Sequence, residues 1–140
     1  MSNRPAYGPN QLTPSSLCFG TMQFGAGADE TDSAAMYHAC REAGINFFDT
    51  AFVYNQGRSE EILGQLITAH RDELIIVTKA GAVGGSSPDN LRSQLETSLT
   101  RLKQDFTDIF FLHMFDADTP LEDSFAALAQ LKQEGKFYHL

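Results

Sequence analysis

Short apolar runs that alternate with amphipathic stretches are the feature that most constrains how this chain can fold. The run at residues 74–78 is unalternating and β-branched, as expected of a strand covered on both faces. Strands that alternate with helices predict parallel pairing and right-handed crossovers. We expect strands at residues 16–20, 45–48, 74–78, 107–112 and 136–140. Two α/β architectures fit this pattern, an open doubly wound sheet and part of a (βα)8 barrel.

Residues typical of helix ends mark four helices between these runs. The candidate helices are residues 31–43, residues 59–70, a helix that begins after Ser87 and one that begins after Thr119. Asp29 or Thr31 can cap the first, and Ser87-Pro88 places an N-cap before a proline at the first helical position. Thr119 and Glu122 have the spacing of a capping box. The first sixteen residues are rich in Pro, Asn, Gly and Ser, which predicts a loop or a short hairpin.

Length and charge limit the classes of protein to consider. The chain has 140 residues, 42% apolar and 20% charged, which favours one domain over residues 1–140. Its formal net charge of −8 disfavours a nucleic-acid partner. No apolar run approaches the roughly 20 residues of a membrane span, and the N-terminus lacks the apolar stretch of a secretory signal. We therefore expect a cytoplasmic protein without a membrane partner.

Three apolar runs each end in a polar or ionisable residue. Asp49 follows the second run, Lys79 the third and His113 the fourth. The carboxyl ends of parallel strands lie on one face, where α/β folds place catalytic groups. Each residue alone is as well explained as a strand end that meets solvent, whereas three together favour a common site.

Tyr54 lies in the loop after Asp49 and can return over the same face. A free phenol is a poor proton donor at neutral pH. An adjacent ammonium stabilises the phenolate and makes a phenol more acidic. Lys79 could supply that ammonium, Asp49 could hold it, and His113 could hydrogen-bond a carbonyl or share the proton.

These residues stand in motifs that resemble those of the aldo-keto reductase superfamily. Residues 49–60 resemble its D-T-A-x-x-Y-x-x-G-x-S-E stretch, and residues 20–25 its G-T-M-x-F-G segment after the first barrel strand. The segments at residues 77–79, 98–102, 105–108 and 112–113 continue the likeness in order. It extends from about residue 12 to residue 140.

The resemblance implies a (βα)8 barrel that reduces aldehyde or ketone carbonyls with NADPH, or with NADH. It makes Tyr54 the general acid, Lys79 and Asp49 the residues that tune its acidity, and His113 the residue that orients the carbonyl. It also places Gly20, Thr21, Met22 and Asp49 near the nicotinamide. The cofactor supplies the hydride, and the protein supplies position and charge.

A complete barrel of this kind needs about 250 residues. This chain supplies four βα units and the start of a fifth strand, so we expect the N-terminal half of a barrel, incomplete at its C-terminal side. An unclosed half-barrel exposes strand edges, which favours self-association or a partner that carries the other half. The alternative function is therefore a catalytically silent half-barrel or interaction module that lacks a complete cofactor site.

Three weaker signals have simpler explanations. The glycine-rich residues 81–85 lack the ending of a phosphate-binding loop, which predicts a flexible βα loop. Asp116 and Asp118 lie at a turn and helix entry, so we expect no metal site. Phe24, Phe52 and Phe115 follow strand ends and could wall a substrate pocket or pack in the core.

Overall fold

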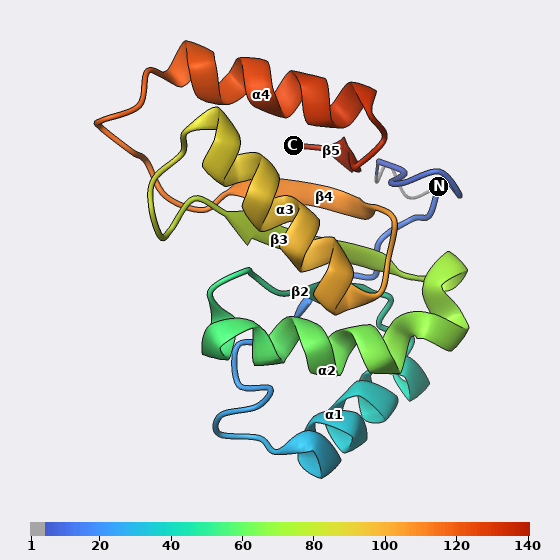
Figure 1. The fold of residues 1–140 in the computed structure, drawn as a ribbon. Coiled ribbons are helices and arrows are strands. Elements are labelled where there is room, and N and C mark those ends of the chain that lie inside the picture. Colours follow the sequence, from blue (N-terminus) through green and yellow to red (C-terminus); the bar gives the residue numbers. More distant parts are fainter. Residues whose placement is uncertain (1–4) are drawn as a thin grey trace.

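The computed structural model describes residues 5–140 as five strands and four α-helices in alternating order (Figure 1). Two short 3₁₀ segments, η1 and η2, flank α2. The elements are β1 (Phe19–Gly20), α1 (Glu30–Glu42), β2 (Phe47–Asp49), η1 (Tyr54–Gly57), α2 (Arg58–Ile67), η2 (Thr68–Glu73), β3 (Ile75–Ala80), α3 (Pro88–Leu102), β4 (Thr107–Leu112), α4 (Leu121–Gln133) and β5 (Phe137–His139).

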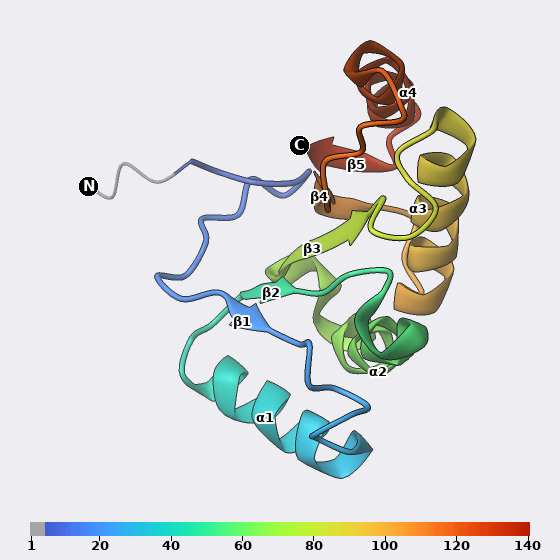
Figure 2. The ribbon, with the colours of Figure 1, turned by 90° about the vertical axis from the view of Figure 1, so that its left-hand side faces the viewer.

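The five strands form one parallel sheet whose spatial order is the order of the sequence, β1-β2-β3-β4-β5. Right-handed crossovers that always step in the same direction place every helix on the same face of the sheet. Figures 1 and 2 show the four helices gathered on one face, with the N-terminal segment on the opposite side. A doubly wound sheet requires a reversal of strand order, which is absent among residues 5–140. The prediction of a partial (βα)8 barrel is therefore confirmed.

Most element boundaries agree with the sequence to within a few residues. β4 occupies residues 107–112 as predicted. β1 is shorter than predicted, and β3 continues through Lys79 to Ala80, so the lysine lies within its strand. The predicted helix over residues 59–70 ends at Ile67, because the backbone of His70 leaves helical geometry at φ −129° and ψ 15°.

Two of the predicted N-caps are correct and one is wrong. The carboxylate of Asp29 and the hydroxyl of Ser87 accept hydrogen bonds from amides in the first turns of α1 and α3. The predicted capping box at Thr119 does not form. The Thr119 hydroxyl instead donates to the Asp116 carboxylate at 2.7 Å, and Pro120 is the N-cap of α4.

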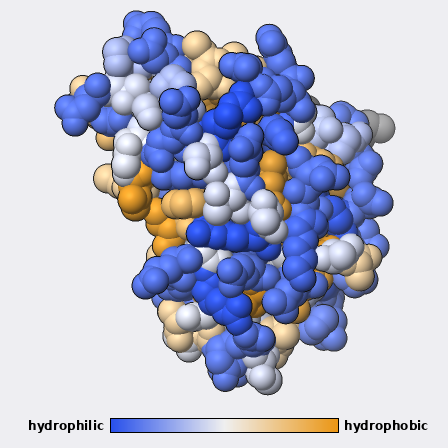
Figure 3. All heavy atoms as spheres, in the orientation of Figure 1, coloured by the Kyte–Doolittle hydropathy of each residue, from blue (hydrophilic) through white to orange (hydrophobic). Residues whose placement is uncertain are grey.

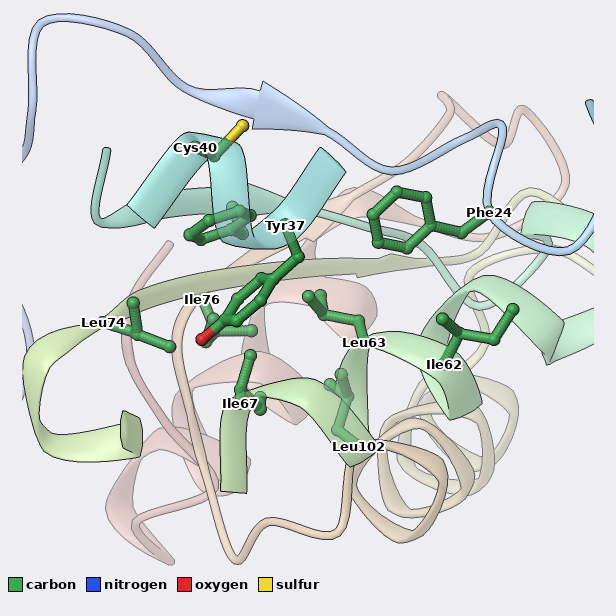
Figure 4. Close-up of a cluster of buried hydrophobic side chains, with 10 residues drawn as sticks. Phe24, Tyr37, Cys40, Ile62, Leu63, Ile67, Leu74, Ile76 and Leu102 are labelled. Atoms are coloured by element: carbon green, nitrogen blue, oxygen red, sulfur yellow. The ribbon is translucent and has the colours of Figure 1, made fainter. Parts of the chain in front are cut away.

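Alternating strand residues build two separate apolar layers. Between the sheet and its helices lie two clusters; the one around Tyr37, Phe48 and Leu63 is drawn in Figure 4. On the opposite, inner face of the sheet, Ile75, Val77 and Ile109 form a third cluster. The helix side seen in Figure 3 is mostly hydrophilic, with smaller hydrophobic areas.

The N-terminal segment packs against the inner face. Tyr7 and Leu12 exchange two backbone hydrogen bonds of 2.9 Å, and both side chains lie against the inner cluster. This is the short hairpin-like turn expected within residues 1–16, of which residues 1–4 lie outside the described part. Among residues 5–140, no helix combines the length and the apolar character needed to cross a membrane.

Gly64 allows α2 and α3 to approach closely. We expect Gly64→Ala to lower the free energy of unfolding by about 1–3 kcal/mol. An added Cβ would lie 2.5 Å from the Arg101 carbonyl oxygen and 2.7 Å from the Leu102 Cα, and this clash exceeds the gain of about 1 kcal/mol in helix propensity. Urea denaturation measures the change.

Gly20→Ala is the control, because nothing lies within 4 Å of a Cβ added there. Its stability should stay within about 0.5 kcal/mol of the parent chain. Equal stability of the two variants would show that the contact between α2 and α3 is not tight at Gly64.

Candidate active site

The four predicted catalytic residues come from two neighbouring strands, from the position directly after a third strand and from the segment η1. Asp49 is the last residue of β2, and its backbone is in register with Val77 of β3, which in turn pairs with Ile109 of β4. Side chains of a strand alternate between its two faces. Val77 belongs to the inner cluster, so Lys79, two residues later, lies on the same inner face.

The Lys79 ammonium connects the other groups. Its Nζ lies 2.6 Å from Asp49 Oδ1 and 2.8 Å from the Thr50 carbonyl oxygen. The third contact is a hydrogen bond of 3.2 Å to the Tyr54 hydroxyl oxygen. An ammonium has three protons, and all three are used. Because Lys79 donates to the phenol oxygen, the phenol proton of Tyr54 remains available for another acceptor.

Burial strengthens this arrangement. The side chains of Lys79 and Asp49 retain 14% and 24% of their exposure. A charge held largely away from water is costly unless a partner compensates it. The ammonium therefore keeps Asp49 and the loop that carries Tyr54 close to β3.

His113 follows β4 and lies beside Tyr54 without a hydrogen bond to it. The two ring centroids are 6.0 Å apart at 86°, and the His113 amide donates to the Ala80 carbonyl oxygen at 2.7 Å. Burial, helped by the Lys79 ammonium and opposed by Asp49, lowers the pKa of His113 below its ordinary value of 6.5. The shift favours the neutral imidazole over the imidazolium. Its buried Nδ1 has no partner among the described residues.

The loop predicted to bind the cofactor, residues 20–22, contains both exposed groups and a buried, hydrogen-bonded one. Nothing lies within 4 Å of a Cβ added to Gly20, and Met22 is 54% exposed. Thr21 is completely buried; its hydroxyl contacts the Asp49 carbonyl oxygen at 3.0 Å and Ser59 Oγ at 2.8 Å. The Thr21 hydroxyl thus supports the loop rather than facing open space.

Comparison with known proteins agrees with this geometry. Residues 16–140 match the Aldo/keto reductase family. The chain belongs to this family. A solved aldo-keto reductase from Bacillus halodurans, in its holo form, is 32% identical and superposes with a TM-score of 0.84 over 99% of this chain and 49% of that one.

Named relatives differ in the roles that their names describe. Aflatoxin B1 aldehyde reductase member 2 of Rattus norvegicus is 46% identical over 126 residues, which cover 86% of this chain and 34% of the rat protein. A probable voltage-gated potassium channel subunit beta of Oryza sativa subsp. japonica is 35% identical over 142 residues, covering 94% of this chain and 43% of the rice protein. The chain thus spans well under half the length of these two relatives.

Several supporting residues of this aldo-keto reductase chain were missed by sequence reasoning. Asn55 donates from Nδ2 to the carbonyl oxygens of Met22 and Phe24 at 2.7 and 2.8 Å, which joins the cofactor loop to the tyrosine loop. Asn55, Gln56 and Gly57 all have positive φ, from 52° to 94°. The Asn-Gln-Gly run was the available signal, because asparagine and glycine tolerate this backbone conformation.

The three phenylalanines after strand ends lie in different surroundings. Phe24 is 1% exposed and packs in the core, Phe52 packs against the Arg101 guanidinium, and Phe115 is 73% exposed. The loop 81–85 is tied down, with the Gly81 amide donating to Gln94 at 2.9 Å and the Gly85 carbonyl accepting from Asn90 at 2.6 Å. Residues 81–85 connect β3 to α3 as expected of a βα loop, and the flexibility of this loop stays a prediction.

Asp116 joins two loops by accepting hydrogen bonds, which lower its pKa; the largest contribution comes from the Thr119 hydroxyl. It also accepts from the amides of Ser86 and Asp118, at 2.7 and 2.9 Å. Within residues 5–140, no cluster of three or more His, Cys, Asp or Glu side chains has the arrangement of a metal site.

The neutral state of His113 can be measured directly. We expect its imidazole to titrate below pH 6.5 in an NMR pH titration, because burial and Lys79 disfavour the imidazolium. The stability that the neutral ring contributes is fully present above the pKa that His113 has in the unfolded chain. It is lost as the pH falls through the lower pKa of His113 in the folded chain.

Lys79→Met should raise the His113 midpoint, since it removes the repelling ammonium and leaves Asp49 unopposed. The midpoint should still lie below 6.5, because burial is the largest cause. A His113 midpoint above 6.5 in the parent chain would contradict the geometry.

Proposed function

We propose that this chain carries the proton-transfer half of an NADP(H)-dependent reductase that converts aldehydes and ketones to alcohols. The observation that carries the proposal is the contact of one ammonium with Asp49 and Tyr54, at 2.6 and 3.2 Å. Substrate class is supported by the relatives named as aldehyde reductases. We further propose that the protein acts in the cytoplasm on small-molecule substrates.

In this mechanism Tyr54 is the general acid. Its hydroxyl proton passes to the carbonyl oxygen as that oxygen gains negative charge, and the ammonium of Lys79 stabilises the phenolate left behind. Asp49 keeps Lys79 charged and oriented. His113, in its neutral form, donates an N–H hydrogen bond to the same carbonyl oxygen. Protonation of the reduced carbonyl gives the alcohol.

A nicotinamide cofactor supplies the hydride when it is bound. The chain offers suitable surroundings for it: Gly20 has open space at its Cα, Met22 is exposed beside it, and both adjoin the strand that ends in Asp49. The buried, unpartnered Nδ1 of His113 is the polar atom in this region that lacks a partner within the described residues. Gly20 and Met22 fit such a group, and in the proposal they lie beside its ribose and ring.

The open inner face supports a second candidate function. Phe111 pairs in register with Lys79 and is 42% exposed. Apolar surface of this kind favours self-association or completion by further barrel strands. A relative named as a channel subunit shows that this family also includes proteins named for an assembly. A chain that binds no cofactor would therefore be an interaction module.

Cofactor binding separates the two candidates. We expect NADPH fluorescence to change saturably when the 140-residue chain, alone or joined to the C-terminal half of an aldo-keto reductase barrel, is titrated. Binding by the joined protein and not by the chain alone would locate the missing contacts in the later strands. Absence of binding in both would refute the reductase proposal and favour the interaction module.

Tyr54→Phe tests the proton donor. In the joined protein it should lower kcat by about 100-fold or more while leaving the Kd for NADPH unchanged, because the hydroxyl that it removes donates the proton and accepts a Lys79 hydrogen bond but does not hold the cofactor in the proposal. Tyr37→Phe is the matched control: its hydroxyl is buried in the helix-side core without a partner among the described residues. Unaltered turnover in Tyr54→Phe would exclude the role of general acid.

A further inference from the structure

A buried ion pair lies on the helix side of the sheet, behind the candidate site. Glu60, in the first turn of α2, has no exposed surface, and its Oε2 lies 3.2 Å from Nη1 of Arg101 on α3. The pair takes no part in the proposed chemistry. We infer that Glu60 and Arg101 are positioning residues that set the placement of Tyr54 relative to Lys79, an inference that rests on the proposed function.

Glu60 holds the strand that carries the lysine. Thr78 donates from its hydroxyl to Glu60 Oε1 at 2.6 Å. Thr78 immediately precedes Lys79, and successive side chains of a strand point to opposite faces. The carboxylate therefore fixes β3 directly behind the residue whose ammonium contacts Tyr54.

Arg101 holds the loop that carries the tyrosine. Its Nη1 donates to the Phe52 carbonyl oxygen at 3.0 Å, and its guanidinium lies 4.6 Å from the centre of the Phe52 ring. The Phe52 amide donates to the Lys79 carbonyl oxygen at 3.0 Å. Phe52, two positions before Tyr54, is thus held by two contacts, one with the Lys79 backbone and one with Arg101 of the ion pair.

Gly57 completes the support at the other end of the loop. A Cβ added there would lie 2.3 Å from Cζ of Arg101, so the guanidinium packs directly against this backbone. The φ of Gly57 is +94°, a conformation that favours glycine. Tyr54 therefore sits between two backbone points, Phe52 and Gly57, that both contact Arg101.

The geometry requires both the charge and the shape of arginine. Glu60 is fully buried, so removing its partner leaves an uncompensated charge. Nη1 of Arg101 contacts both the Glu60 carboxylate and the Phe52 carbonyl oxygen, while the flat guanidinium packs on the Phe52 ring and against Gly57. A lysine could neutralise Glu60 but has no planar group to pack there. Arg101→Lys thus preserves the charge while removing the packing on Phe52 and Gly57, and Glu60→Gln removes the charge while keeping an acceptor for Thr78.

Turnover of the joined protein tests whether the pair acts through Tyr54. We expect Arg101→Lys and Glu60→Gln to lower kcat by roughly 10- to 100-fold, as a shift of about 1 Å does, with the Kd for NADPH changed less than about twofold. In a Tyr54→Phe background the same substitutions should cost less than about twofold more, because the group that they position is absent. Equal losses in both backgrounds would overturn the inference.

Arg92→Met is the matched control. Arg92 lies on the same helix and forms an ion pair with Glu134, with Nη2 2.7 Å from Oε1, away from Tyr54. Its kcat should remain that of the parent protein. If Arg101→Lys merely lowered the melting temperature and left kcat unchanged, the pair would be structural and the inference wrong.

Amide hydrogen exchange of the 140-residue chain keeps this test separate from the proposed function. Exchange at Phe52 and Tyr54 should accelerate in Arg101→Lys but not in Arg92→Met, whether or not the chain binds NADPH. Faster exchange, together with a joined protein that binds no NADPH and shows no turnover, would refute the reductase while retaining the positioning of the loop. Unchanged exchange at Phe52 and Tyr54 would overturn the positioning inference in an active protein as well.

Discussion

One partly buried ammonium organises this half-barrel. Lys79 has 14% of its side chain exposed and uses all three protons, on the Asp49 carboxylate, the Thr50 carbonyl and the Tyr54 hydroxyl. Each bond lowers the cost of holding a positive charge away from bulk water. The same bonds hold the end of β2 and the loop after it against β3. A structural requirement and the proposed proton chemistry thus depend on a single group.

The order of the strands makes this meeting possible. Parallel strands in sequential order bring Asp49 and Lys79, 30 residues apart in the chain, within 2.6 Å at one edge of the sheet. The helices on the outer face then provide a second layer of support, in which Ser59 contacts the hydroxyls of Thr21 and Thr50 at 2.8 and 3.0 Å. These outer hydroxyls secure the backbone behind the candidate site.

Sequence reasoning predicted the features that local chemistry determines. The alternation of strands and helices, the cap at Ser87 and the polar residues after apolar runs all follow from neighbours in the chain. It failed at Thr119, where two local partners compete: the spacing is that of a capping box, but Asp116, three residues earlier, accepts the hydroxyl. It also failed where the partner is distant in the chain, since nothing near Glu60 in the sequence indicates that Arg101, 41 residues later, neutralises it.

Proton handling and ligand binding are separable in this architecture. The bonds of Lys79 all end between residues 49 and 54, so the candidate acid is assembled without any contribution from β5. The residues that would cover a bound carbonyl or cofactor are, in contrast, exposed. Phe111, in register with Lys79, and Met114 beyond β4 are 42% and 58% exposed. Under the proposed function, affinity therefore depends on what covers these residues, whereas the hydrogen bond from Lys79 to the candidate acid is already present.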